Sequence, residues 1–258
     1  LKIVANYAVG YDNINLADAQ KSGVVVTNTP GILTHSVAEH AMALTMACAK
    51  RLVEADTFTR HEKYKGWEPM LFLGQELYGK VFGVVGAGRI GQRVAQIASL
   101  GFGMHILYTN PSRDHEFEKQ VHAKRVSLPK LLQNADVVSL HVPLLPETVH
   151  LIDVKELKMM KKTAILVNTS RGPVVSEKAL TSALKKNEIF AAGLDVFECE
   201  PAIDCDKGDA LELRKLSNVI ITPHVASATT EARDEMARIA ARNIIAVLSG
   251  KKALTPVF

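Results

Sequence analysis

Cysteines and long apolar runs are scarce in this chain of 258 residues. The three cysteines, Cys48, Cys199 and Cys205, are odd in number and lack the spacing of metal ligands, so we expect a reducing compartment, no structural disulfide and no metal site. No stretch is apolar enough to span a bilayer, and no basic segment followed by an apolar one opens the chain. These absences predict a cytoplasmic protein without a membrane partner.

Clustered positive charge is also missing. The net charge is +4, but lysines and arginines are scattered, and aromatic residues make up only 5% of the chain. Because nucleic-acid-binding surfaces gather basic and aromatic side chains in one stripe, this pattern excludes that class of partner. With 47% apolar and 22% charged residues, the composition is typical of a globular protein with one large or two modest domains.

A glycine-rich segment lies between a predicted strand and a predicted helix. The apolar run 81–85 precedes three spaced glycines, and a helical pattern over 92–100 follows them. Gly86 permits a tight turn, Gly88 lets backbone approach a pyrophosphate, and Gly91 lets the helix pack closely on the strand. The helix N-terminus favours the negative charge of phosphates. We therefore predict a dinucleotide site whose contacts here are Gly86, Gly88, Arg89, Ile90 and Gly91.

Strands and helices alternate from Val81 onward. Strands are expected over 81–85, 104–108, 136–141, 163–168, 189–195 and 219–222, and helices over 92–100, 127–133, 153–160 and 176–186. Continuous apolar strands in such alternation are typical of a doubly wound parallel sheet with both faces covered. The fold class expected is therefore α/β, with a dinucleotide-binding Rossmann domain over 32–229.

Residues outside this region predict a second, smaller domain. Its expected elements are strands over 1–5 and 24–27 and helices over 15–21 and 231–248, the last with an apolar stripe that includes Met236, Ile244 and Leu248. The break at 28–31 predicts a crossing between domains, so we expect the smaller, flavodoxin-like domain to comprise 1–31 and 230–258. Because Leu1 already lies within a strand-like run, we expect this domain, and hence the protein, to be incomplete at its start.

An apolar helix and an aperiodic arm predict a homodimer. The helix over 36–54 is apolar nearly all round and begins with a capping box formed by Ser36 and Glu39. The arm over 64–79 has little periodicity, and its apolar residues include Trp67, Met70, Leu71, Phe72 and Leu73. A second subunit covers such surface better than water does, so we expect a dimer joined through the cofactor domain. The alternative is an arm that folds back on its own domain.

Polar residues follow four of the predicted strands. In a doubly wound sheet, ligands bind beyond the carboxyl ends of the strands. The segments at such positions are His141–Leu144, Asn168–Gly172, Asp195–Pro201 and Thr222–His224. We expect Arg171, Glu200 and His224 to lie at one edge of the sheet, beside the nicotinamide end of a bound dinucleotide.

The order of these motifs closely resembles that of the D-isomer-specific 2-hydroxyacid dehydrogenase family, and within it the glyoxylate/hydroxypyruvate reductases. The resemblance spans the chain through the segments 6–14, 86–91, 168–172, 193–198 and 222–224. It implies reversible hydride transfer between NAD(P)H and a small 2-oxo acid, glyoxylate or hydroxypyruvate. It also implies that Arg171 holds the substrate carboxylate, that His224 is the acid/base, and that Glu200 is its partner. The backbone of Val9 and Gly10 is implied to bind the carboxylate from the other side.

The side-chain chemistry agrees with these implied roles. An arginine fork can grip a carboxylate through two hydrogen bonds while staying charged. A carboxylate paired with a histidine fixes its tautomer and raises its pKa, so the imidazole can deliver a proton near neutral pH. Glu200 is preferred to Glu198 because the family motif places its glutamate before a proline, here Pro201. No metal is expected, because arginine and histidine supply the polarisation. Asp195 either orients the nicotinamide amide or caps its turn.

The cofactor expected is NADP(H), with NAD(H) as the alternative. In NAD-binding versions an acidic residue at the end of the second strand accepts the ribose hydroxyls and repels a 2′-phosphate. Here Thr109 holds that position, and Asn110, Ser112 and Arg113 can donate to a phosphate. The other cofactor contacts expected are Val142, Pro143, Thr148, Thr169, Ser170 and Asp195.

A dinucleotide-sensing binding protein of the corepressor type is the alternative from another functional class. Relatives of that kind keep the same three site residues, so those residues do not discriminate between the two functions. Turnover of glyoxylate would favour the enzyme, whereas tight cofactor binding with negligible turnover would favour the sensor.

Overall fold

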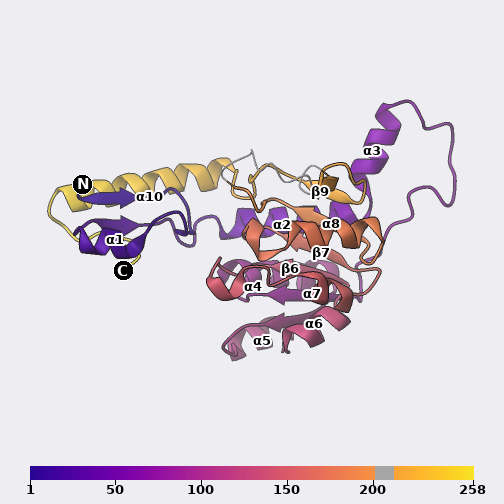
Figure 1. Cartoon of the computed structure of the whole chain (residues 1–258), viewed down its shortest axis with the longest axis horizontal. Coiled ribbons are helices and arrows are strands. Elements are labelled where there is room, and N and C mark those ends of the chain that lie inside the picture. Colours follow the sequence, from indigo (N-terminus) through magenta and orange to yellow (C-terminus); the bar gives the residue numbers. More distant parts are fainter. Residues whose placement is uncertain (201–211) are drawn as a thin grey trace. The chain divides into compact units, whose positions relative to one another are not determined.

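The computed structural model describes residues 1–200 and 212–258 (Figure 1). The chain divides into two compact units, one made of 1–37 and 227–258 and the other spanning 38–226. The first crossing falls within a helix, and the second falls shortly before the last helix of the chain. Pro201 and Cys205 lie outside the described residues.

A seven-stranded parallel sheet forms the centre of the larger unit. Its strands are Val81–Val85 (β3), His105–Thr109 (β4), Lys124–Arg125 (β5), Val137–Leu140 (β6), Ile165–Asn168 (β7), Ala191–Leu194 (β8) and Val219–Ile221 (β9). In the order β5–β4–β3–β6–β7–β8–β9, the chain starts at β3, builds one edge and then returns to build the other. This order confirms the predicted doubly wound α/β fold, with its switch point between β3 and β6. The short strand β5 is an element that the sequence analysis missed.

Helices cover both faces of this sheet (Figure 1). They are Thr34–Ala49 (α2), Arg89–Gln96 (α4), His115–Val121 (α5), Leu128–Asn134 (α6), Val154–Met159 (α7) and Glu177–Lys185 (α8), with short helical turns at Ile97–Gly101 (η1), Pro146–Thr148 (η2) and Gly172–Val174 (η3). One core contains buried residues of α2, α4 and α5, and the other contains those of α6, α7 and α8. Because both faces are covered, the central strands β6, β7 and β8 are buried along their whole length.

The single helix expected over 36–54 is in fact two helices. The first, α2, ends at Ala49, and Arg51 then has a left-handed φ of 53°. The Gln75 N–H, from a later part of the chain, donates to the Ala49 carbonyl oxygen at 2.7 Å. That carbonyl oxygen would otherwise accept from the next turn of α2. At Gly74 a Cβ would lie only 2.3 Å from that oxygen. A long-range contact therefore ends α2, although the apolar pattern continues into Leu52–Arg60 (α3).

The capping box expected at Ser36 and Glu39 is also wrong. Helix α2 begins two residues earlier, at Thr34, and the Val37 N–H already donates to the Leu33 carbonyl oxygen at 3.0 Å. Ser36 therefore lies within the first turn, and its hydroxyl hydrogen-bonds to that of Thr229 at 2.8 Å.

The smaller unit contains a two-stranded parallel sheet of Ile3–Ala5 (β1) and Val25–Thr27 (β2), connected by Leu16–Lys21 (α1). Helix Thr230–Leu248 (α10) packs on both strands, and the C-terminal tail pairs with β2 in the antiparallel direction. Of the apolar stripe expected on α10, Met236 is buried, whereas Ile244 and Leu248 are exposed. The stripe predicted from periodicity is thus only partly correct.

The cysteines correct another expectation. Cys199 is disulfide-bonded, although no structural disulfide was expected. Cys48 is free and buried, and burial raises the pKa of its thiol to about 12, so it stays protonated and is a poor nucleophile. Within 1–200 and 212–258, no helix is long and apolar enough to cross a membrane, and no cluster of three His, Cys, Asp or Glu residues could hold a metal ion.

Candidate active site

The turn between β3 and α4 is closely packed at one glycine and open at another. Gly86 has a φ of 92°, and a Cβ there would lie 2.8 Å from the carbonyl oxygen of His141. Gly88 is the N-cap of α4, and a Cβ there would meet nothing within 4 Å, so this side of the turn is open. The first N–H groups of a helix have no intrahelical acceptor. The N-terminus of α4 can therefore donate to phosphate oxygens at this opening.

Gly91 keeps α4 close to β3. A Cβ there would lie 2.2 Å from the Gly86 carbonyl oxygen and 3.0 Å from Cγ1 of Val84. We expect Gly91→Ala to displace the helix at a cost of about 1–3 kcal/mol and to weaken NAD(P)H binding about tenfold, which corresponds to about 1.4 kcal/mol. Fluorescence titration with the reduced cofactor measures the affinity. Gly101→Ala is the matched control, because a Cβ there meets nothing within 4 Å; equal affinities for the two variants would contradict the role of Gly91.

The loop after β4 carries the residues expected at the adenosine ribose. Asn110 donates through Nδ2 to the Ser112 carbonyl oxygen at 3.3 Å. The Arg113 Nε donates to both carboxylate oxygens of Glu118, at 3.0 and 2.9 Å. This ion pair holds the guanidinium beside the loop.

Arg125 also holds this loop, which sequence reasoning missed. Its Nε and Nη2 donate to the carbonyl oxygens of Asn110 and Pro111, at 2.9 and 2.8 Å. Arg125 belongs to β5, the strand that was not predicted. Only the pairing of β5 with β4 brings the arginine to this position.

The hydroxyls expected to touch the cofactor differ in their surroundings. The Thr148 hydroxyl donates to the Pro143 carbonyl oxygen at 2.7 Å and accepts from the Leu145 N–H at 2.8 Å, so it is engaged within its own turn. The Ser170 hydroxyl donates to Oδ1 of Asn168 at 2.8 Å. The Thr169 hydroxyl, in contrast, is buried without a hydrogen-bond partner among the described residues. A buried hydroxyl without a partner just beyond β7 fits a polar group of a bound dinucleotide.

His224 follows β9 and pairs with Glu200. Its Nδ1 lies 2.5 Å from Oε2 of Glu200. Because an ionised carboxylate only accepts hydrogen bonds, Nδ1 carries the proton, and Nε2 is the ring atom that can exchange one with a substrate. The hydrogen bond to Glu200 raises the pKa of His224 above its usual value despite the opposing effect of burial. The nearby charge of Asp195 adds to the rise, and that of Arg171 opposes it.

The turn that carries His224 is strained, and Asp195 holds it. The φ of His224 is 54°, in the left-handed region that residues with side chains seldom adopt. Asp195 is fully buried and accepts from the N–H groups of Val225 and Ala226 at 2.9 and 2.7 Å, and from the Thr222 hydroxyl at 2.5 Å. These contacts favour the turn-capping alternative for Asp195.

His40 also reaches this network, which sequence reasoning missed. Its Nε2 lies 3.0 Å from the Thr222 hydroxyl and 3.5 Å from Oδ1 of Asp195. Burial raises the pKa of Asp195, but its hydrogen bonds with His40, Thr222 and the backbone outweigh burial and lower the pKa below its usual value. The one signal in the sequence was a histidine on a helix that is otherwise largely apolar.

Arg171 lies in the short loop between β7 and η3, where it is the N-cap residue of η3. Its Nη1 donates to the Ser170 carbonyl oxygen at 2.8 Å. The next residue, Gly172, passes so close to the segment of Glu200 that a Cβ there would lie 1.8 Å from the carbonyl carbon of Phe197. The structure thus brings Arg171, Glu200 and His224 to the carboxyl ends of neighbouring strands.

The loop of Val9 and Gly10 lies in the smaller unit. Two asparagine side chains donate to carbonyl oxygens of this loop. Asn28 Nδ2 donates to the Val9 carbonyl oxygen at 2.8 Å, and Asn6 Nδ2 donates to the Gly10 carbonyl oxygen at 2.7 Å. No described residue accepts a hydrogen bond from the N–H groups of Val9 and Gly10.

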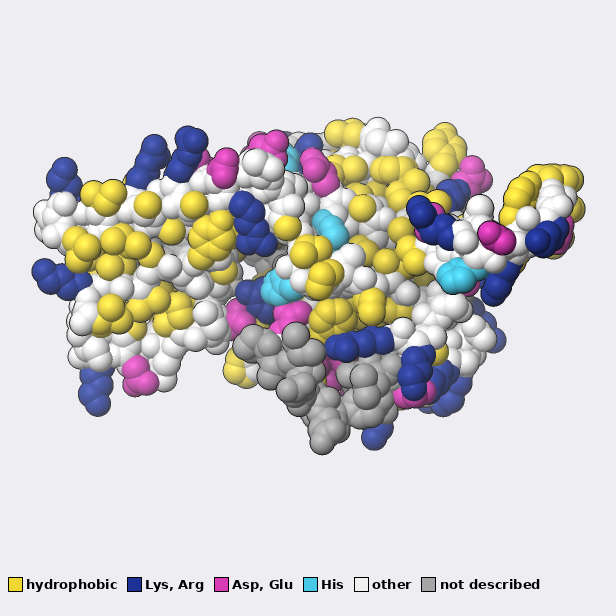
Figure 2. Space-filling model, turned by 90° about the horizontal axis from the view of Figure 1, so that it is seen from above, with side chains coloured by type: hydrophobic (Ala, Val, Ile, Leu, Met, Phe, Trp, Pro, Cys, Tyr) yellow, Lys and Arg dark blue, Asp and Glu magenta, His cyan; other side chains and the backbone are white. Residues whose placement is uncertain are grey.

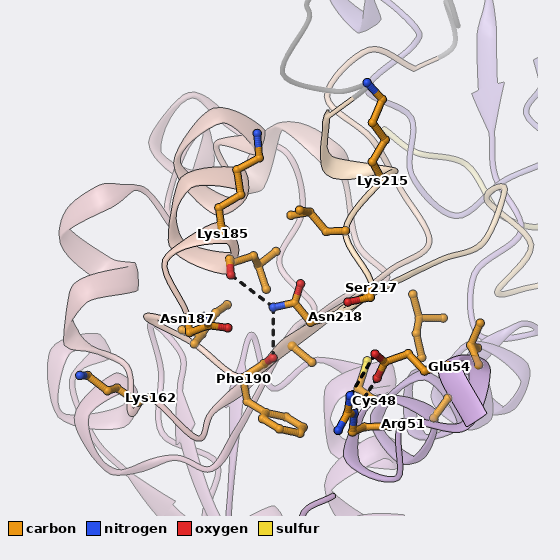
Figure 3. Close-up of a pocket in the computed structure, with 17 residues that line it drawn as sticks. Cys48, Arg51, Glu54, Lys162, Lys185, Asn187, Phe190, Lys215, Ser217 and Asn218 are labelled. Atoms are coloured by element: carbon orange, nitrogen blue, oxygen red, sulfur yellow. Dashed lines mark hydrogen bonds and ion pairs between the residues drawn. The ribbon is translucent and has the colours of Figure 1, made fainter. Parts of the chain in front are cut away.

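A cavity of about 600 Å³ lies elsewhere in the larger unit (Figure 3). It is lined by Ala191, which begins β8, and by Asn218, which precedes β9, so it lies at the amino ends of these strands. Figure 3 shows Lys185 and Lys215 directed away from it, and Glu212 pairs with both lysines at 2.8 and 2.9 Å. Because Arg171 and His224 follow the carboxyl ends of their strands, this cavity is not the candidate active site.

The family model described as "D-isomer specific 2-hydroxyacid dehydrogenase, NAD binding domain" matches residues 42–226. The glyoxylate reductase of Korarchaeum cryptofilum is 53% identical over 97% of this chain and 74% of that protein. The glyoxylate reductase of Thermococcus litoralis is 52% identical over 97% of this chain and 75% of that protein.

Solved structures agree with these matches. A glyoxylate reductase from Paecilomyes thermophila is 33% identical with a TM-score of 0.88, covering all of this chain and 75% of that one. A D-lactate dehydrogenase from Aquifex aeolicus, complexed with NAD and lactic acid, is 33% identical with the same TM-score of 0.88, covering 97% of this chain and 77% of that one. The family model spans the whole parallel sheet, and the two relatives are identical to this chain at about half of the aligned positions. It follows that the chain belongs to the D-isomer-specific 2-hydroxyacid dehydrogenase family, whose members are NAD(P)-dependent oxidoreductases.

Proposed function

We propose that this protein reduces a short 2-oxo acid, glyoxylate or hydroxypyruvate, to the 2-hydroxy acid, with Arg171, Glu200 and His224 as its catalytic residues. The observation that carries the proposal is the hydrogen bond between Nδ1 of His224 and Glu200, in a site to which Arg171 adds positive charge. The relatives named glyoxylate reductase support this choice of substrate. The comparisons give the corepressor alternative no support.

The described residues supply every part of this reaction except the hydride. When bound, the reduced nicotinamide supplies a hydride to the carbonyl carbon of the substrate. Arg171 binds the substrate carboxylate and orients the carbonyl. Protonated His224 donates from Nε2 to the carbonyl oxygen as that oxygen gains negative charge, and Glu200 fixes the ring throughout. In the reverse direction Nε2 takes the proton back from the hydroxyl.

The remaining parts of the proposal concern the smaller unit and the location. We assign the unit of 1–37 and 227–258 to substrate binding, with the N–H groups of Val9 and Gly10 as donors to the carboxylate. The absence of described acceptors for these N–H groups supports that role. A cytoplasmic location stays a prediction, and the disulfide at Cys199 weakens the argument from cysteine usage.

A substrate panel tests the proposed function. We expect kcat/KM of the purified protein to be highest for glyoxylate or hydroxypyruvate among short 2-oxo acids, measured from the oxidation of the reduced cofactor. Tight cofactor binding without turnover of any 2-oxo acid would contradict the proposal and favour a binding protein.

The cofactor preference is open to a direct test at the end of β4. Thr109 presents no negative charge to repel a 2′-phosphate, and Arg113 lies beside the same loop, so we propose NADPH in preference to NADH. We expect a preference of about tenfold in kcat/KM, since about 1.4 kcal/mol suffices, and one charge-assisted hydrogen bond supplies this much. Thr109→Asp should reverse the preference, because the new carboxylate accepts from the ribose hydroxyls and repels the phosphate.

Kinetics with both cofactors check this preference. Arg113→Ala should remove most of the preference, whereas Lys178→Ala, which changes an exposed lysine on α8, should leave it unchanged. Equal kcat/KM values in the wild-type protein would contradict the proposal.

The arm over 64–79 supports a homodimer, for a narrower reason than the sequence suggested. Helix α2 is buried against the sheet of its own unit and needs no partner to cover it. Helix α3 buries no residue, and the arm after it projects from the rest of this unit (Figure 1), with hydrophobic side chains gathered on the projection (Figure 2). Trp67 and Met70 are 81% and 72% exposed. We propose that a second copy covers these side chains.

Light scattering tests the dimer. We expect a mass of about 56 kDa, twice the chain mass of 28.1 kDa. Trp67→Glu combined with Met70→Glu should shift the protein toward the monomer, because carboxylates do not enter an apolar interface. Leu100→Glu is the control, since Leu100 is 76% exposed outside the arm. A monomer at micromolar wild-type concentration would refute the dimer.

A further inference from the structure

The turn of residues 197–200 contains a second glutamate that is paired with a second histidine. Glu200 accepts from Nδ1 of His224, and Oε1 of Glu198 lies 2.5 Å from Nε2 of His150. The side chain of Glu198 is the more buried of the two glutamates, at 17% exposed against 30% for Glu200. One short turn is therefore held by two histidines from different parts of the chain.

His150 is itself fixed to the segment that follows Arg171. The His150 N–H donates to the Pro173 carbonyl oxygen at 2.8 Å, and the Ile152 N–H donates to the Val174 carbonyl oxygen at 3.1 Å. His150 also has a left-handed φ of 50°. The pair of His150 and Glu198 thus joins the glutamate turn to the η3 segment that Arg171 precedes.

The turn is also held from its inner side. The Glu198 N–H donates to Oε1 of Glu177 at 2.7 Å, and Gly172 packs directly against Phe197. The carboxylate of Glu200 closes the turn, because its Oε1 accepts from the Phe197 N–H at 3.2 Å while its Oε2 binds His224. A displacement of the turn would therefore move the carboxylate that fixes the imidazole of His224.

We propose that His150 and Glu198 act as positioning residues, which hold the 197–200 turn so that Glu200 stays on Nδ1 of His224. This inference rests on the catalytic roles proposed above for Glu200 and His224. The physical reason is exposure: the side chains of Glu200 and His224 are 30% and 49% exposed, so water competes for their hydrogen bond. Fixing the turn in advance lowers the conformational entropy that this hydrogen bond costs. Neither His150 nor Glu198 is assigned a contact with the substrate.

Four single variants and one double variant test the proposal. Glu198→Ala and His150→Asn each break the positioning pair, and asparagine suits the left-handed backbone at position 150. Glu200→Gln removes the carboxylate charge beside His224, and Glu212→Ala is the control because Glu212 forms its ion pairs with Lys185 and Lys215. The measurements are the pH profile of kcat/KM for glyoxylate reduction and the Kd of NADPH.

The pH profile and the Kd of NADPH together distinguish a positioning role from a general loss of structure. We expect Glu198→Ala and His150→Asn to lower kcat/KM about tenfold, with the falling limb of the pH profile moved to lower pH, as in Glu200→Gln. The double variant of positions 150 and 198 should lose no more than either single variant, because both act through one contact. The Kd of NADPH should not change, and Glu212→Ala should match the wild type.

Two results would overturn the inference, and a third would overturn the proposed catalytic roles on which it rests. If Glu200→Gln moves the limb but the variants of positions 150 and 198 do not, these two residues do not position Glu200. A parallel loss of NADPH affinity in those variants would show a structural role alone. If Glu200→Gln itself leaves the limb in place, the proposed roles of Glu200 and His224 fail.

Discussion

Arg171→Ala is expected to lower kcat/KM for 2-oxo acid reduction by at least two orders of magnitude. Its guanidinium is a positive group near His224, and a neutral methyl group cannot hold a carboxylate there. Loss of a bidentate charge-assisted contact costs about 3 kcal/mol of transition-state stabilisation. Arg171→Lys should recover only part of the activity, because an ammonium has no planar fork.

Steady-state kinetics with glyoxylate check this prediction. Added guanidinium ion should partly restore Arg171→Ala, because it returns the missing group to the space that the side chain vacates. Arg238→Ala changes an exposed arginine on α10 and should match the wild type. Near wild-type kcat/KM in Arg171→Ala on every 2-oxo acid tested would show that another residue holds the carboxylate.

His224→Asn is expected to lower kcat by a factor of about 10²–10⁴, the usual contribution of a general acid. Asparagine tolerates the left-handed φ of 54°, so the turn held by Asp195 should persist while the proton donor is lost. His122→Asn is a matched control, because His122 is exposed and has a similar φ of 51°. An unchanged kcat in His224→Asn would remove His224 from the mechanism.

The pH dependence of reduction gives the same prediction a second readout. Reduction needs protonated His224, so kcat/KM should fall as pH rises through the pKa of His224 in the free enzyme. Because Glu200 raises that pKa, activity should persist above the usual titration range of histidine. Glu200→Gln should move the fall to lower pH, and His224→Asn should abolish this limb. A limb at the same pH in Glu200→Gln would contradict the pairing.

The dinucleotide turn and the parallel sheet could be predicted because their requirements are local. A pyrophosphate needs small residues at fixed spacing before a helix, and strands buried on both faces need continuous apolar runs. Glu200 was preferred to Glu198 from its place in a motif, and the structure pairs each glutamate with a different histidine. Strand β5, which the sequence analysis missed, is only two residues long, and both residues are charged and exposed. It therefore has no apolar pattern by which a strand could be predicted.

The sequence by itself determined the fold class, the glycine turn and the three side chains of the candidate site. Tertiary structure decided where α2 ends, because Gln75 from a distant part of the chain takes the Ala49 carbonyl oxygen. It also decided what Asp195 does, because three donors from the segment 222–226 converge on that one buried carboxylate. The same physical reason applies to α2 and to Asp195. Hydrogen bonds between residues far apart in the chain depend on how the helices and strands pack, so no periodic pattern in the sequence predicts them.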